Sequence, residues 1–204
     1  MSAIDAEDLC VSWIRDHVIR LGLCPYAATP MTQEKIRYYV SDAKTDEELL
    51  DDFFVEGKLL LDTPNDELAT TMLIAPHYPG SIDEFSELYT WLVTLLESGD
   101  EPLLNNCVQP AFFHPAWSFE GLPPESAIHF EKRAPLPIIN LLRRSDLDDV
   151  VRQGLANGRI VNKEIAEHNA AALETEGYET LLAFFKKHLD ASHVLTVGNG
   201  PTQS

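Results

Sequence analysis

The sequence predicts a single α/β domain with a mixed, partly parallel sheet of three to five strands and helices packed on it. Strand-like runs alternate with helix-like segments between residues 36 and 115, which is the order typical of such folds. A hydrophobic fraction of 45% over 204 residues suits one core of ordinary size. We expect this domain to span residues 1–190, followed by a mobile C-terminal tail over residues 191–204.

A first helix is predicted to begin at Asp5, because an aspartate can cap the first turn. Apolar residues then recur at helical spacing as far as Leu21. Gly22 is placed to end this helix in a left-handed conformation, with Leu23 closing a Schellman motif and Pro25 preventing continuation.

The middle of the chain is predicted as strand, helix, strand, helix, strand. The strands are expected at Ile36–Val40, Thr70–Ala75 and Cys107–Pro115, where β-branched, aromatic and other apolar residues concentrate. Thr45 and Ser81 each precede a glutamate by three residues, which is the capping-box pattern of a helix start. Strands joined by helices favour right-handed crossovers and parallel pairing.

The Cys107–Pro115 stretch is predicted to be a buried strand that carries His114 at its end. A residue before proline favours extended geometry, and ligands of open α/β sheets bind at the carboxyl ends of the strands. Side chains alternate along a strand, so Gln109 and Phe113 are expected on one face and His114 on the other. Pro110 would permit a bend or bulge that brings the two faces together.

After this strand, residues 116–137 are expected to form an irregular, proline-rich loop. Pro137 fits the first turn of a helix, so we predict a helix over residues 138–143. A long C-terminal helix is predicted from Asn162, with an interruption near Gly177.

Composition argues against several partners. The net charge is −18, with 33 acidic and 15 basic residues, and a field of that sign repels nucleic acid and anionic membranes. No apolar run approaches the length of a membrane span, and the acidic segment Met1–Asp8 lacks the basic start of a signal peptide. Three cysteines without a CxxC pair predict a reducing, cytoplasmic location.

Three stretches contain no Asp or Glu although the chain is very acidic: His17–Gln33, Pro102–Phe119 and Lys132–Ser145. The third also holds four of the fifteen basic residues. If these stretches meet in the fold, they form a neutral-to-positive hollow that would concentrate a small anion. The alternative is that buried segments lack carboxylates in any protein.

Three motifs taken together carry a resemblance to a known family. They are Leu21–Ala27, Gln109–Pro115, and Arg133–Pro137 with Leu141–Arg143. The chain resembles the bacterial and plastid proteins catalogued as domain of unknown function 1415, from about Trp13 to Gly177. Asn140 stands where the family pattern has a histidine, and Arg133–Pro137 replaces the pattern Arg-Ser-Pro-Tyr-Pro. The resemblance implies no named reaction.

His114 and Cys24 are the catalytic candidates. A histidine can act as general acid or base near neutral pH, and it could activate Cys24 as a nucleophile. The alternatives are a hydrogen-bonded structural histidine and a buried cysteine that packs as a small hydrophobic residue. Cys24 follows the carboxyl end of a predicted helix, where the helix dipole disfavours a thiolate.

Arg133, Arg143 and Gln109 are the candidate substrate-binding residues. A guanidinium can hold a carboxylate or phosphate with two hydrogen bonds, although either arginine could instead pair with a nearby acid. We expect these three residues to line one pocket with Cys24 and His114, at the carboxyl edge of the central strands.

The sequence contains no Walker loop, no GxGxxG and no tight metal-ligand spacing, so no metal site is predicted and the cofactor stays open. His77 and His114 both follow predicted strands and could lie near each other, and Cys24 could complete a set of three metal ligands. The predicted function is an enzyme that acts on a small anionic metabolite, either a carboxylate or a phosphate. The alternative is a non-catalytic protein that binds a small ligand or a metal. The oligomeric state stays open.

Overall fold

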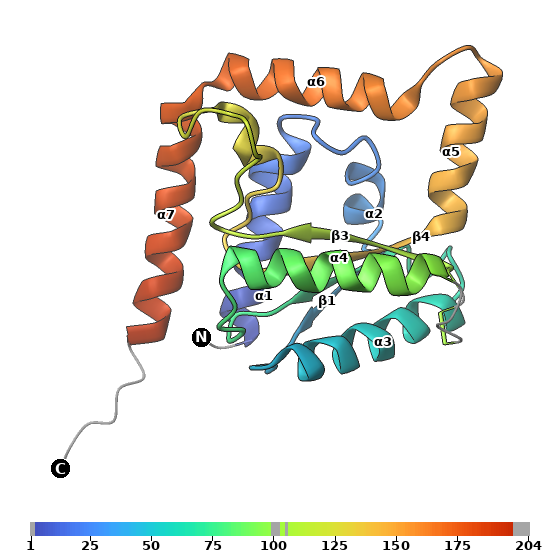
Figure 1. The fold of residues 1–204 in the computed structure, drawn as a ribbon, viewed down its shortest axis with the longest axis horizontal. Helices are drawn as coiled ribbons and strands as arrows, with labels where there is room; N and C mark the ends of the chain where they lie inside the picture. The colour runs from blue at the N-terminus through green and yellow to red at the C-terminus, as the bar shows by residue number, and fades with distance from the viewer. Residues whose placement is uncertain (1–2, 99–102, 105, 198–204) are drawn as a thin grey trace.

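A computed structural model describes residues 3–98, 103–104 and 106–197. Its sheet has four strands in the order β1-β2-β4-β3, where β1 and β2 are parallel and β4 is antiparallel to both β2 and β3 (Figure 1). The strands are β1 (Ile36–Val40), β2 (Thr70–Ile74), β3 (Val108–Phe113) and β4 (Ile138–Arg143). The predicted single α/β domain with a mixed sheet is therefore confirmed.

The helices cover both faces of this sheet and extend beyond one of its ends. They are α1 (Ala3–Trp13), the π-helix η1 (Ile14–Ile19), α2 (Ala28–Thr32), α3 (Asp46–Asp62), α4 (Ile82–Ser98), the 3₁₀-helix η2 (Ala127–Glu131), α5 (Arg144–Ala156), α6 (Val161–Glu176) and α7 (Tyr178–Val197). Helices α5, α6 and α7 form a frame along the right, top and left of Figure 1. None of the helices in the described ranges is long and apolar enough to cross a membrane.

The predicted capping box at Ser81 forms, whereas at Thr45 only the hydroxyl half forms, because the Glu48 carboxylate accepts the Lys44 N–H at 2.7 Å instead of the Thr45 N–H. The Thr45 hydroxyl accepts the Glu48 N–H at 3.2 Å and begins α3. At the start of α4, the Ser81 hydroxyl accepts the Glu84 N–H at 3.2 Å, and the Glu84 carboxylate accepts the Ser81 N–H at 2.7 Å. These side chains replace the hydrogen bonds that a helix start lacks, so each helix begins where the sequence indicates.

The predicted Schellman motif ends the first helical segment. Gly22 has a φ of +67°, and its N–H donates to the Ile19 carbonyl at 3.0 Å. The Leu23 N–H donates to the Val18 carbonyl at 2.9 Å. This pattern of two bonds turns the chain sharply, so Cys24 follows directly on a rigid corner.

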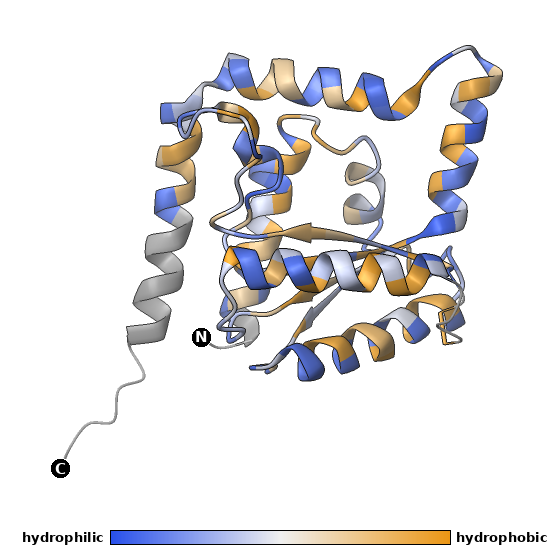
Figure 2. Cartoon of the chain, viewed as in Figure 1, coloured by the Kyte–Doolittle hydropathy of each residue, from blue (hydrophilic) through white to orange (hydrophobic). Residues whose placement is uncertain are grey.

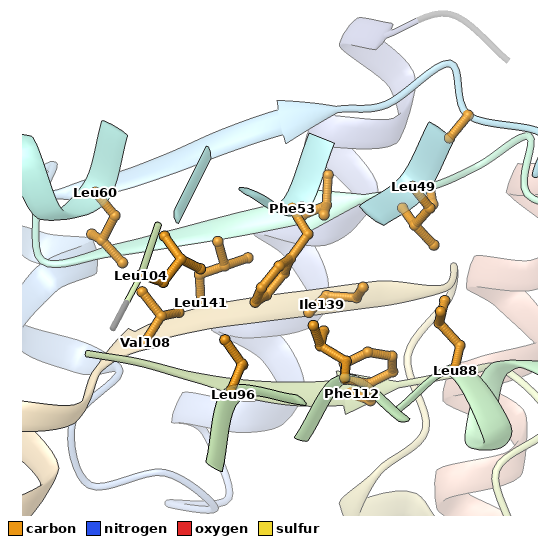
Figure 3. Packing of buried hydrophobic residues seen from close by; sticks show 14 of the residues in the cluster. Leu49, Phe53, Leu60, Leu88, Leu96, Leu104, Val108, Phe112, Ile139 and Leu141 are labelled. Atoms are coloured by element: carbon orange, nitrogen blue, oxygen red, sulfur yellow. The ribbon is translucent and has the colours of Figure 1, made fainter. Parts of the chain in front are cut away.

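The core lies in two layers, one on each face of the sheet. Figure 3 shows the first layer, where Leu49, Phe53 and Leu60 of α3 and Leu88 and Leu96 of α4 meet the strand residues Val108, Phe112, Ile139 and Leu141. The second layer joins α1, α7 and η2 to the opposite face. Along the helices, hydrophobic and hydrophilic residues alternate as expected for elements with one buried face (Figure 2).

The predicted helix over residues 138–143 is wrong, because this segment is strand β4. It lies between β2 and β3, and Ile138, Ile139 and Leu141 are at most 1% exposed. A short apolar run that is covered on both faces has no alternation, so its periodicity does not separate a strand from a helix. Pro137 precedes the strand instead of opening a helix.

The strand with the Phe-His-Pro motif, which was predicted to be buried, is at the edge of the sheet. In β3 only every second residue is buried, and Pro110 sits in a strand that has one neighbour, β4. Proline has no N–H for a second ladder, so an edge position suits it.

The expected loop over residues 116–137 contains η2, and the interruption near Gly177 separates α6 from α7. Helix α7 continues to Val197, within the stretch predicted as a tail. Residues 198–204 lie outside the described residues, so the mobility of the tail stays a prediction.

Candidate functional site

A cavity of about 490 Å³ lies over the sheet face that is opposite α3 and α4. Its floor is formed by side chains of three strands. They are Thr70 and Met72 from β2, Ala111 and Phe113 from β3, and Asn140 and Leu142 from β4. Ala111 pairs directly with Asn140 in the ladder, so the smallest side chain of the floor leaves space beside a polar one.

The three stretches without Asp or Glu meet at this cavity. The first contributes the corner Leu23–Ala27, the second contributes Ala111 and Phe113, and the third contributes Lys132 and Asn140. The predicted convergence of these stretches is therefore observed, although they meet over a face of the sheet and not at its carboxyl edge.

Lys132 is the first polar group of the cavity. Its ammonium lies 5.0 Å from the centre of the Phe113 ring, in a cation–π contact. Among the residues that the structure describes, no hydrogen bond or ion pair holds this ammonium. Burial lowers the pKa of Lys132, and the charges of Glu131 and Cys24 act in the opposite direction. The Lys132 side chain therefore lines the cavity as a hydrogen-bond donor, and the nearby charges offset only part of the effect of its burial.

Asn140 is the second polar group, on the floor of the cavity. Its Oδ1 lies 2.6 Å from the Thr70 hydroxyl, which also lies 2.7 Å from the Leu141 carbonyl. The hydroxyl has one proton, so it donates to Asn140 Oδ1 or to the Leu141 carbonyl, and the Nδ2 group has no partner within the described ranges. Asn140 thus presents amide N–H donors on the same cavity that Lys132 lines.

Cys24 also lines the cavity, next to the corner that Gly22 forms. Burial raises the pKa of the Cys24 thiol above its usual range. The backbone N–H groups of Tyr26 and Ala27 and the charge of Lys132 lower the pKa by smaller amounts. Burial, the largest of these influences, therefore favours the protonated thiol.

The acidic groups that line the cavity are already bonded. The Glu131 carboxylate accepts the Asn169 amide at 3.1 Å. The two oxygens of Asp146 accept from Asn65 at 3.2 and 3.0 Å. These carboxylates are therefore held by neutral donors, and neither forms an ion pair with Lys132 within 4 Å.

His114 follows β3 as predicted, but it faces away from the cavity. Its ring lies 5.4 Å from that of Phe85 in α4, and its Nδ1 accepts the Ala116 N–H at 3.1 Å. Burial lowers its pKa, and the Gly80 backbone acts in the opposite direction. The strand is not bent enough to bring its two faces together, so His114 and Cys24 lie on opposite sides of the sheet.

Arg133 lies outside the cavity as well. Its Nε donates to the Trp117 carbonyl at 2.9 Å, and its guanidinium lies 4.6 Å from the centre of the Phe130 ring. Burial lowers the pKa of Arg133, and Tyr178 acts in the opposite direction. The side chain thus ties the 116–137 segment to the second core layer.

Arg143 lines the cavity, but its Nη2 donates to the carbonyls of Leu60, Thr63 and Leu68 at 2.5, 2.6 and 3.0 Å. Gln109 lines an adjoining hollow of about 280 Å³ and donates to the Pro110 carbonyl at 3.3 Å. The expected single pocket of five residues is therefore wrong, because only Cys24 and Arg143 share the cavity. The roles assigned to the five residues stay predictions.

No group of three or more His, Cys, Asp or Glu side chains is arranged to hold a metal ion in the described part of the chain. The set considered from the sequence, His77, His114 and Cys24, is accordingly not gathered there.

The sequence did not predict Lys132 and Asn140 as binding residues. Lys132 was noted only as part of a basic stretch, and Asn140 only as a difference from the family pattern. Both lie in the Lys132–Ser145 stretch without carboxylates, which is the sequence feature that could have indicated them. The departure at Asn140 falls on the cavity floor, and Asn169, which is 3% exposed, also lines the cavity.

Comparison with known proteins identifies one match. A family model described as a protein of unknown function, DUF1415, matches residues 5–182. No match was found among the curated proteins or among the solved structures.

Proposed function

Since this chain belongs to the DUF1415 family, whose description names no reaction, we propose its function from the cavity: it binds a small anionic metabolite over the sheet, with Lys132 and Asn140 as the contacts. The metabolite carries a carboxylate or a phosphate, since both accept hydrogen bonds from an ammonium and an amide.

One observation carries this proposal: Lys132 Nζ and Asn140 Nδ2 are donors of the cavity without a hydrogen-bond partner in the described residues, whereas Asn169 Oδ1 is the one buried acceptor of the lining without a partner there. An anion would satisfy both and would restore the charge balance that burial of Lys132 disturbs. Concave, mainly apolar cavities with a few convergent polar groups are the usual form of small-molecule sites. The nearby carboxylates are held by Asn169 and Asn65, so they leave the ammonium available.

We propose an enzyme as the first class, with Cys24 as the reacting group. Cys24 shares the cavity with Lys132, and a bound substrate would lie against both. The charge of Lys132 lowers the pKa of the Cys24 thiol, so the ammonium would favour the thiolate that such a reaction needs. His114 as acid–base and Arg133 as an anion contact would require a rearrangement, since each faces elsewhere.

A non-catalytic binding protein is the second candidate. The raised pKa of Cys24 favours it, because a thiol that stays protonated is a weak nucleophile. Turnover separates the two classes: a bound metabolite that is chemically changed by the wild type and unchanged by Cys24→Ser supports the enzyme.

The binding proposal is tested by calorimetry with inorganic phosphate and a panel of carboxylates on the wild type and Lys132→Met. A hydrogen bond to a charged group contributes about 1.5–3 kcal/mol, so the variant is expected to lose roughly 10-fold to 150-fold in affinity. Lys58→Met is the matched control. It removes the same charge, and Lys58 is an exposed residue of α3 that pairs with Asp62. Equal affinity of all three proteins for every anion would refute the proposal.

A further inference from the structure

We infer that the ligand of this cavity is an amphiphilic anion, in which one carboxylate or phosphate group is joined to an apolar body. This inference rests on the proposed function and names the class of molecule that the same cavity takes. It follows from the contrast between the two free donors and the surface around them.

The surface around these donors is mainly apolar. Its large side chains are Trp13, Ile14, Leu23, Ile36, Met72 and Phe113. The indole N–H of Trp13 donates to the Arg133 carbonyl at 3.1 Å, so the ring offers the cavity an apolar face. A sugar phosphate or a tricarboxylate would leave hydroxyl groups or charges without partners against these walls, whereas an alkyl or aryl body would not.

The cavity has room for such a body to continue. Tyr26, Val150 and Ile165 line the cavity, the adjoining hollow and an outer hollow of about 820 Å³ under α5 and α6. These three side chains are therefore the partition between an inner and an outer space. A longer tail would leave the inner cavity past them, while its anionic head stays against Lys132 and Asn140.

The test is a series of straight-chain carboxylates from acetate to octanoate, with inorganic phosphate, citrate and neutral octanamide as comparisons, measured by calorimetry at pH 7. Each buried methylene contributes enough to tighten binding about fourfold, so the dissociation constant should fall steadily with chain length. Octanamide should bind more weakly than octanoate. Lys132→Met should weaken octanoate while keeping the dependence on chain length.

Ala111→Leu gives an independent check, because the larger side chain would fill the floor beside Asn140. Because the anionic head lies against Asn140, the affinities for octanoate and for acetate should both fall, and no loss for either would contradict this placement of the head. Ala171→Leu, on the exposed face of α6, is the matched control. Circular dichroism confirms that each variant is folded, and the wild-type series decides the question if Ala111→Leu is not.

The outcomes separate this inference from the proposed function. Binding of phosphate or citrate as tight as that of octanoate, with no effect of chain length, would overturn the amphiphilic class and leave anion binding intact. Failure of every anion to bind would overturn both. If octanamide bound as tightly as octanoate, the requirement for an apolar body would stand, and the requirement for an anionic head group would be overturned.

Discussion

Phe113 and His114 are neighbours in the chain, yet their side chains point to opposite faces of the sheet. Phe113 lies under the Lys132 ammonium in the cavity, and His114 packs on Phe85 in the other core layer. The alternation of a strand separates them, and no bend removes it. A motif that reads as one unit in the sequence therefore contributes to the cavity through one residue and to packing through the next.

The environment of His114 predicts an acid-sensitive fold. Burial lowers its pKa below the usual 6.5, so the unfolded state takes up a proton at a higher pH than the folded state. Its contribution to stability is complete above pH 6.5 and is lost as the pH falls through the lower folded value. Protonation also removes the Nδ1 acceptor of the Ala116 N–H.

We expect His114→Asn to flatten the decline of the free energy of unfolding between pH 7 and pH 5, since an asparagine oxygen can replace Nδ1 without titrating. Urea unfolding at several pH values measures this. The remaining histidines are the same in both proteins, so parallel curves for the wild type and the variant would show that His114 has no such role.

The end of the first helical segment shows how one element positions the cavity. The π-helix η1 and the Schellman motif at Gly22 bring the chain to Cys24 and Tyr26 within a single turn. Both residues line the cavity, so its wall depends on the left-handed conformation of one glycine.

Gly22→Ala should lower the free energy of unfolding by about 1–2 kcal/mol, because alanine resists a φ of +67°. Gly121→Ala is the matched control: Gly121 has a φ of +78° and nothing within 4 Å of an added Cβ, whereas Gly22 has His168 Nε2 at 3.0 Å. Thermal or urea unfolding of both should show the larger loss for Gly22. An equal loss would mean that His168 moves aside without cost.

The whole molecule is organised around β4, which contacts both core layers. Ile138 belongs to the layer with α1 and α7, and Ile139 belongs to the layer with α3 and α4. β2 does the same with Leu73 and Met72, so the strands join the two layers and the two should unfold together.

We expect Ile138→Val and Ile139→Val each to lower the free energy of unfolding by about 0.5–1.5 kcal/mol, since both side chains are at most 1% exposed. In urea, tryptophan fluorescence and circular dichroism should report one coincident transition for the wild type and both variants. Two separate transitions would contradict a single cooperative domain.

The sequence by itself determined the local elements. Capping boxes at Thr45 and Ser81 and the glycine at position 22 placed helix ends correctly, because each signal acts through hydrogen bonds within a few residues. The alternating pattern predicted β1 and the buried apolar run predicted β2, because both patterns can be recognised within a few consecutive residues. The three stretches without carboxylates were also visible in the chain, whereas their meeting at one cavity was decided by the fold.

Only the tertiary structure decided which basic side chain is left for a ligand. Arg143 is held by carbonyls of residues 60–68 and Arg133 by the carbonyl of Trp117, whereas Lys132 makes a cation–π contact with Phe113 and no hydrogen bond to any described residue. It likewise decided that residues 138–143 form a strand, because β2 and β3 lie on either side of them. Partners far apart in the chain set both results, and no local pattern records which distant residues will meet.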